Sequence, residues 1–290
     1  MISAPALVTA TIGILALVPL LGPGGPDPSV AISARALVLE RADSADAALR
    51  ELEAAIAPGL DVARSGAARV VAGEDAPGEA LVEAGRLLAA ADPVAAHAAD
   101  AVLALEGARR AARDGGTAMQ PPAEGGDLAS IGAQVEGTAA AADRFAEMRL
   151  RADRVLVALS TAIDALEAGD VTTASATLSR AREDQEAVAA WDVGLVTLPV
   201  WTDAAGALLT AAEALLAATA AGDASAAAAA ASVLEAQAED AASADRALRI
   251  AMAEGGASVT AAPLSRLADL LRRTAETRLA VAEILHGADR

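Results

Sequence analysis

The chain of 290 residues contains no cysteine, lysine, asparagine or tyrosine, and its aromatic residues are Phe145, Trp191 and Trp201. The absence of cysteine excludes disulfides, thiolate metal sites, a cysteine nucleophile and a lipid-modified cysteine anchor. The absence of lysine means that the glycines of residues 65–78 cannot complete a Gly-Lys-Ser/Thr phosphate loop. Lys, Asn and Tyr have A/T-rich codons, so their joint absence indicates a GC-rich genome rather than a function.

Basic residues are also few, because 22 Arg stand against 40 Asp and Glu and give a formal net charge of -18 at pH 7. An acidic surface repels phosphate backbones, and the sequence has no Arg-rich arm to offset that field. We therefore expect no nucleic-acid partner.

Long apolar runs are absent except at the start, where residues 4–22 are nearly all apolar and no charge precedes Asp27. As a helix this run would span about 28 Å, close to the hydrocarbon thickness of about 30 Å. Glycine and proline at positions 22–26 then end any helix. The sequence predicts a transmembrane or signal-anchor helix over 1–22 and a Gly/Pro linker over 23–31.

Residues 1–22 allow three interpretations, of which a retained anchor is the first. Ser29-Val30-Ala31 offers a small-x-small cleavage pattern, which would give a secreted protein, although it lies well beyond the apolar run; a buried soluble helix is a third interpretation. Arg35 and Arg41 favour a cytoplasmic C-terminal side by the positive-inside rule. Signal-like segments at an extreme N-terminus, however, usually direct export of the downstream chain. We expect a retained single-pass anchor in the cell membrane, with the bulk of the chain extracytoplasmic.

After residue 31 the apolar residues recur at helical spacing and no segment shows β alternation. A seam runs from Val38 to Ile56, and Pro58 is expected to end that helix. Asp92 is expected to cap a new helix that begins at Pro93. The further predicted helices cover about 61–72, 78–91, 93–114, 128–168, 171–190, 204–221, 224–253 and 263–287, with a loop at 254–263.

These patterns predict an all-α fold, an elongated antiparallel and Ala-rich helical bundle. Gly and Pro pairs in 115–126 indicate a flexible linker between an N-terminal helical part, 32–114, and a C-terminal helical bundle, 127–290. Gly169-Asp170 and Gly222-Asp223 are each expected to end one helix and cap the next. The sequences before these two turns are similar enough to raise a duplicated helical hairpin as an alternative to chance.

Both tryptophans lie in residues 191–203, which we expect to be a non-helical connection. Tryptophan dominates contact energies where it is used, so Trp191 and Trp201 are the candidate partner-contact residues. The competing interpretation is that both rings fold back and plug the open end of the bundle.

No pattern predicts a catalytic, cofactor-binding or metal-binding residue. His97 and Asp100 are three positions apart on one helix, but no second histidine lies near them, and His286 is isolated. The arginines of 144–154 fit a solvated face with a Glu147 to Arg151 pair.

The sequence therefore favours a membrane-tethered, extracytoplasmic helical scaffold or interaction module that contacts envelope proteins or itself. One alternative is an enzyme that uses carboxylates in an interhelical cleft, and another is a membrane-anchored cytoplasmic adaptor. A histidine placed in a pocket with two carboxylates would favour the enzyme.

Overall fold

The computed structural model describes residues 28–74, 76–113, 118–191 and 194–287, and within these residues it is all-helical, which confirms the predicted fold class. The predicted membrane segment, 1–22, lies outside the described residues, as does most of the 23–31 linker. The helices are α1 (Pro28–Ala72), α2 (Pro77–Ala111), α3 (Asp127–Gly137), α4 (Ala139–Glu167), α5 (Val171–Ala189), α6 (Thr197–Ala220) and α7 (Ala224–Gly287).

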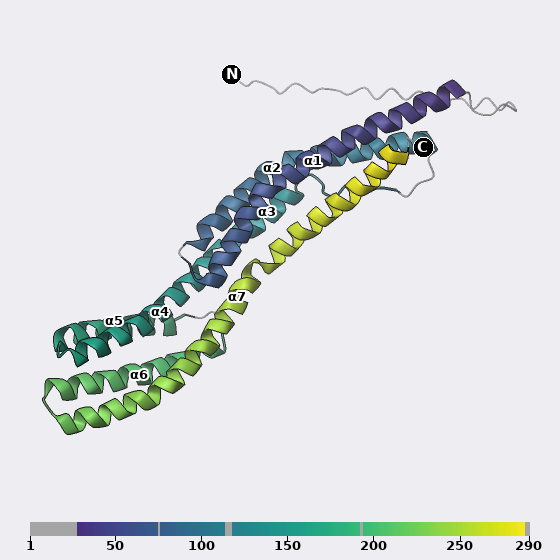
Figure 1. Ribbon diagram of the computed structural model, residues 1–290. Coiled ribbons are helices and arrows are strands. Elements are labelled where there is room, and N and C mark those ends of the chain that lie inside the picture. The colour runs from purple at the N-terminus through teal and green to yellow at the C-terminus, as the bar shows by residue number, and fades with distance from the viewer. Residues whose placement is uncertain (1–27, 75, 114–117, 192–193, 288–290) are drawn as a thin grey trace, which may run out of the picture.

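The helices form an elongated bundle in which α7 runs the whole length (Figure 1). Its 64 residues correspond to about 96 Å. The C-terminal part of α7 packs in one hydrophobic cluster with α1, α2 and α3, and the N-terminal part packs in a second cluster with α4, α5 and α6. One continuous helix therefore joins two cores.

The segment predicted as a flexible linker is packed where the structure describes it, at residues 118–126. Pro122 and Ala123 are buried, and the Met119 N–H donates to Glu106 Oε1 at 2.9 Å. The two clusters do not divide at this segment, because the C-terminal part of α7 packs with α1 and α2. The domain division at 115–126 stays a prediction.

Three expected helix breaks are wrong. α1 continues through Pro58, α2 continues through Asp92 and Pro93, and α7 continues through the expected loop at 254–263. Pro58 and Pro93 are exposed, so each ring lies on the solvent side where a missing N–H can be tolerated. Packing along both neighbouring turns then outweighs the local cost of proline.

The glycines of the expected 254–263 loop serve packing instead of breaking the helix. A Cβ at Gly255 would lie 2.9 Å from Phe145 Cε1, and a Cβ at Gly256 would lie 2.7 Å from Val70 Cγ1. Small residues thus let α7 approach α4 and the end of α1 at the junction between the two cores.

Asp92 caps a helix other than the one expected. Its carboxylate accepts backbone N–H bonds from Gly126 (2.9 Å), Leu128 (3.1 Å) and Ala129 (3.2 Å), which are the unpaired donors at the start of α3. Gly126 itself offers no side chain there. The carboxylate on α2 therefore fixes the N-terminus of α3.

Two other boundaries differ from the prediction. The single helix expected over 128–168 is divided into α3 and α4 at Gly137 and Thr138, and the Thr138 hydroxyl donates to Val135 O at 2.7 Å. The helix expected at 204–221 begins earlier, at Thr197.

The two predicted Gly-Asp turns are confirmed. Gly169 and Gly222 have φ of 77° and 69°, a backbone region that glycine adopts without strain. Asp170 and Asp223 then cap α5 and α7. Hydrogen bonds from Thr173 lower the pKa of Asp170, so this cap is present above the usual carboxyl pKa and is lost as pH falls through the lowered value. The two turns match, yet duplication stays a prediction.

Two helices, α2 and α6, are long and apolar enough to cross a membrane by length and composition alone. Both also contribute to the core clusters, and a buried core helix passes the same test. The weak membrane signal in the described residues therefore does not select a single span.

Candidate functional site

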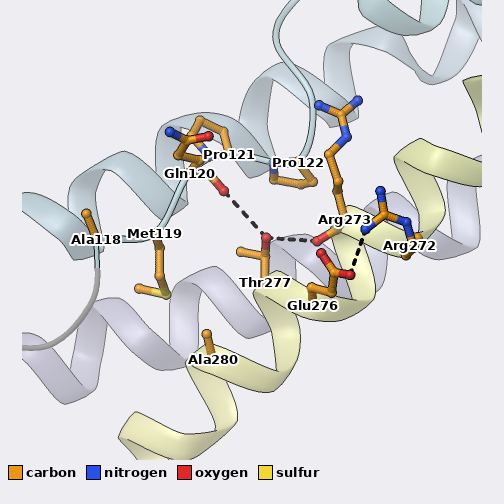
Figure 2. A pocket seen from close by; sticks show the side chains of 10 residues that line it. All are labelled: Ala118, Met119, Gln120, Pro121, Pro122, Arg272, Arg273, Glu276, Thr277 and Ala280. Carbon is orange, nitrogen blue, oxygen red and sulfur yellow. Dashed lines mark hydrogen bonds and ion pairs between the residues drawn. The ribbon is translucent and has the colours of Figure 1, made fainter.

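A strap of residues 118–122 lies along α7, and a groove of about 600 Å³ is lined by the two (Figure 2). Within the groove Arg272 pairs with Glu276 at 2.8 Å. The Thr277 hydroxyl lies 3.4 Å from Gln120 O and 2.9 Å from Arg273 O. The carboxylate of Glu276 and the hydroxyl of Thr277 are thus both engaged in contacts within the groove.

A second hollow, of about 610 Å³, lies on the α2 side of the strap. Gln120, Pro121 and Arg273 line both hollows. Arg273 is exposed, and Leu103 on α2 is 50% exposed beside it.

His286 lies in a groove of about 400 Å³ between α1 and α7, together with Asp46 and Glu53. This is the arrangement that would favour an enzyme. Both carboxylates are ion-paired, however: Arg278 Nε lies 3.5 Å from Asp46 Oδ1, and the Arg278 guanidinium also binds Glu53. Arg50 pairs with Asp46 as well.

The imidazole of His286 is turned toward its own helix, with Nδ1 2.7 Å from Ala282 O, so Nδ1 donates its proton to that carbonyl. His97 and Asp100 are both exposed on α2. In the part of the chain that the structure describes, no group of three or more His, Asp or Glu side chains could hold a metal ion.

The arginines of 144–154 have structural contacts. Arg151 binds Glu147 at 2.9 Å, as the spacing predicts, and also lies 3.3 Å from Asp184 on α5. Arg149 donates to Val71 O at 2.5 Å and so satisfies a carbonyl at the C-terminus of α1.

The two tryptophans have different environments. Trp201 lies inside α6 and is 1% exposed, so the expectation of a non-helical connection over 191–203 is wrong for its second half. Trp191 follows α5 and is partly exposed. Leu198 and Trp201 are three positions apart and both pack in the second core cluster. Because a helix places residues at this spacing on one side, the hydrophobic run from Leu195 becomes helical.

Trp191 lines a hollow of about 300 Å³ with Leu195, Leu198, Pro199 and Asp203. Val196 and Val200 beside it are 91% and 60% exposed. We call Trp191, Leu195, Val196, Pro199 and Val200 the Trp191 patch. Sequence reasoning singled out the tryptophan but missed the valines, because apolar spacing alone does not tell an exposed side of a helix from a buried one.

No family model matches this chain. No curated protein and no solved structure shows significant similarity to it either.

Charge is distributed unevenly along the bundle. No basic residue occurs between Arg182 and Arg246, a stretch that covers α6 and the start of α7 and carries many carboxylates. Arg182 is itself paired with Glu213 at 3.0 Å. At the other end, each of Arg50, Arg272 and Arg278 forms an ion pair with a carboxylate. The end formed by α6 and the start of α7 is the acidic one.

Proposed function

We propose that this protein is a membrane-tethered, extracytoplasmic helical scaffold, held by residues 1–22, that binds other envelope proteins through the Trp191 patch. The observation that carries the proposal is the patch itself, where Val196 is 91% and Val200 60% exposed, next in sequence to Leu195 and Pro199, which line the hollow with Trp191. Large exposed apolar side chains around a partly buried tryptophan are typical of protein interfaces.

The position of the patch supports a scaffold. The end of α5 and the start of α6 lie inward from the end of the bundle where α6 meets α7, and not at either tip (Figure 1). Because α7 joins both cores as one helix, the two ends of the molecule keep a fixed separation from the patch. A rod of this kind can hold a bound partner at a set distance from a membrane.

The location is tested by a reporter fused after residue 290, together with the mass of the mature N-terminus. We expect activity from a reporter that functions only outside the cytoplasm, and a mass that includes residues 1–31. The helical backbone at 28–31 supports retention, because proteases prefer extended chain to helix. Activity only from a cytoplasmic reporter would favour the adaptor alternative, and a mass beginning after Ala31 would indicate secretion.

The patch is tested by a photo-crosslinking residue at Val196 in intact cells. We expect discrete cross-linked products that disappear when Trp191→Ala is added, because that substitution removes the wall of the hollow. The matched control is the same crosslinker at Val157 on α4, which is 66% exposed. Identical products from both positions, or products that Trp191→Ala leaves intact, would contradict the proposed binding surface.

The enzyme alternative has one supporting observation, the groove that holds His286 with Asp46 and Glu53. In the enzyme alternative the carboxylates act as general acid and base, and for that role they must be free to exchange protons with a substrate. Both carboxylates are instead bound by one guanidinium group, that of Arg278, which joins α7 to α1. The scaffold is therefore the better-supported function.

A further inference from the structure

The first turns of α1 extend beyond the core of the bundle. α1 begins at Pro28, yet the first buried residue described along it is Val38, which is 7% exposed. Before that point Ile32 is 70% exposed and Leu37 is 41% exposed. Figure 1 shows this start of α1 projecting past the neighbouring ends of α2 and α7.

These two side chains do not share one side of the helix. Five positions separate them, which places them about 140° apart around the axis. They flank the stripe that begins at Val38 and continues at Ala42 into the core. A single neighbouring helix would cover one flank only, whereas a surrounding apolar medium would cover both.

The linker limits how far residues 28–37, which we call the overhang, can lie from the predicted membrane segment. Only residues 23–27 separate Gly22 from the start of α1. A fully extended chain of that length reaches about 20 Å. If residues 4–22 span the hydrocarbon, α1 starts no more than about 20 Å from its edge, so the first turns of α1 can reach the headgroup layer, which adds roughly 5–8 Å on each side.

The charge distribution orients the rest of the rod. The end formed by α6 and the start of α7 is acidic and lacks basic residues, so anionic lipid repels it. Figure 1 places that end opposite the start of α1. The overhang is therefore the end that can approach a lipid surface.

We propose that residues 28–37, the first turns of α1, insert into the membrane interface, with Ile32 and Leu37 in contact with lipid. This inference rests on the proposed tether. Apolar side chains at the boundary between headgroups and acyl chains gain from leaving water. The contact would fix the angle of α1, and with it that of the whole rod, to the membrane. Without this contact the tether would leave that angle free to vary.

The absence of cysteine makes a labelling test direct. Single substitutions Ile32→Cys and Leu37→Cys in the full chain carry an NBD fluorophore, and the protein is reconstituted into vesicles of equal parts phosphatidylcholine and phosphatidylglycerol. We expect both labels to be quenched by nitroxide lipids and shielded several-fold from aqueous iodide. Val157→Cys, on an exposed site of α4, is the matched control and should be open to iodide.

A fourth label, at Ile14→Cys, reports the tether separately. The inference would be overturned, and the tether left standing, if the label at 14 contacts lipid while the labels at 32 and 37 are quenched by iodide as strongly as the label at 157. A label at 14 that is open to iodide would overturn the tether itself. Shielding of only one of 32 and 37 would indicate a neighbouring helix instead of lipid, and would also overturn the inference.

Discussion

Replacement of Trp201 by alanine is expected to lower the free energy of unfolding by about 3–5 kcal/mol. The indole is 1% exposed and packs in the second core cluster, where most of its neighbours are alanine, leucine and valine. Ala-rich helices offer few large side chains that could move into the vacated volume. The cavity would therefore persist, and the loss should fall toward the upper part of that range.

The measurement is urea unfolding followed by far-ultraviolet circular dichroism, with Trp191→Ala as the matched control. Trp191 follows α5, is partly exposed and packs against that cluster without being buried in it, so its truncation should cost clearly less than that of Trp201. Equal losses from the two variants would contradict the burial of Trp201 and the partial exposure of Trp191.

Interactions between residues close in sequence were predictable. Gly169 with Asp170, and Gly222 with Asp223, form turns whose hydrogen bonds join residues at most five positions apart. The Glu147 to Arg151 pair is equally local. Such features follow from glycine's access to positive φ and from helix periodicity, both of which a single sequence displays.

Contacts between distant residues were not predictable. Asp92 has the right neighbours to cap a helix at Pro93, but its carboxylate binds the start of α3, 34 to 37 positions away. α1 and α2 continue through proline because packing against other helices outweighs the local cost of proline. The sequence shows that cost but not the packing that compensates for it.

The candidate site illustrates the same limit. His286 shares a groove with Asp46 and Glu53 only because α7 returns along α1, and no spacing in the sequence joins residues so far apart. The sequence predicted only part of the Trp191 patch, namely its tryptophan. Its tryptophan is recognisable by composition, whereas the exposure of Val196 and Val200 depends on which side of α6 the core occupies.

The crossing of α2 and α3 depends on two glycines that face each other. A Cβ at Gly132 would lie 2.5 Å from Gly85 O, and a Cβ at Gly85 would lie 2.6 Å from Gly132 O. Both obstacles are backbone carbonyls, which cannot turn aside as a flexible side chain can. The helices would have to separate to admit even one methyl group.

Gly132→Ala is therefore expected to lower the free energy of unfolding by about 2–3 kcal/mol, although alanine is the better helix former. The matched control is Gly107→Ala on α2, where no atom lies within 4 Å of the new Cβ. That substitution should raise stability by about 0.5–1 kcal/mol, because it removes only the conformational freedom of glycine.

The double variant with Gly85→Ala and Gly132→Ala distinguishes a shared close contact from two independent ones. If one separation of α2 from α3 accommodates both methyl groups, the combined loss will be smaller than the sum of the single losses. The measurement is urea unfolding of the single and double variants under one set of conditions. Strict additivity, or an increase in stability for Gly132→Ala like that of Gly107→Ala, would show that the two backbones are not in contact at this crossing.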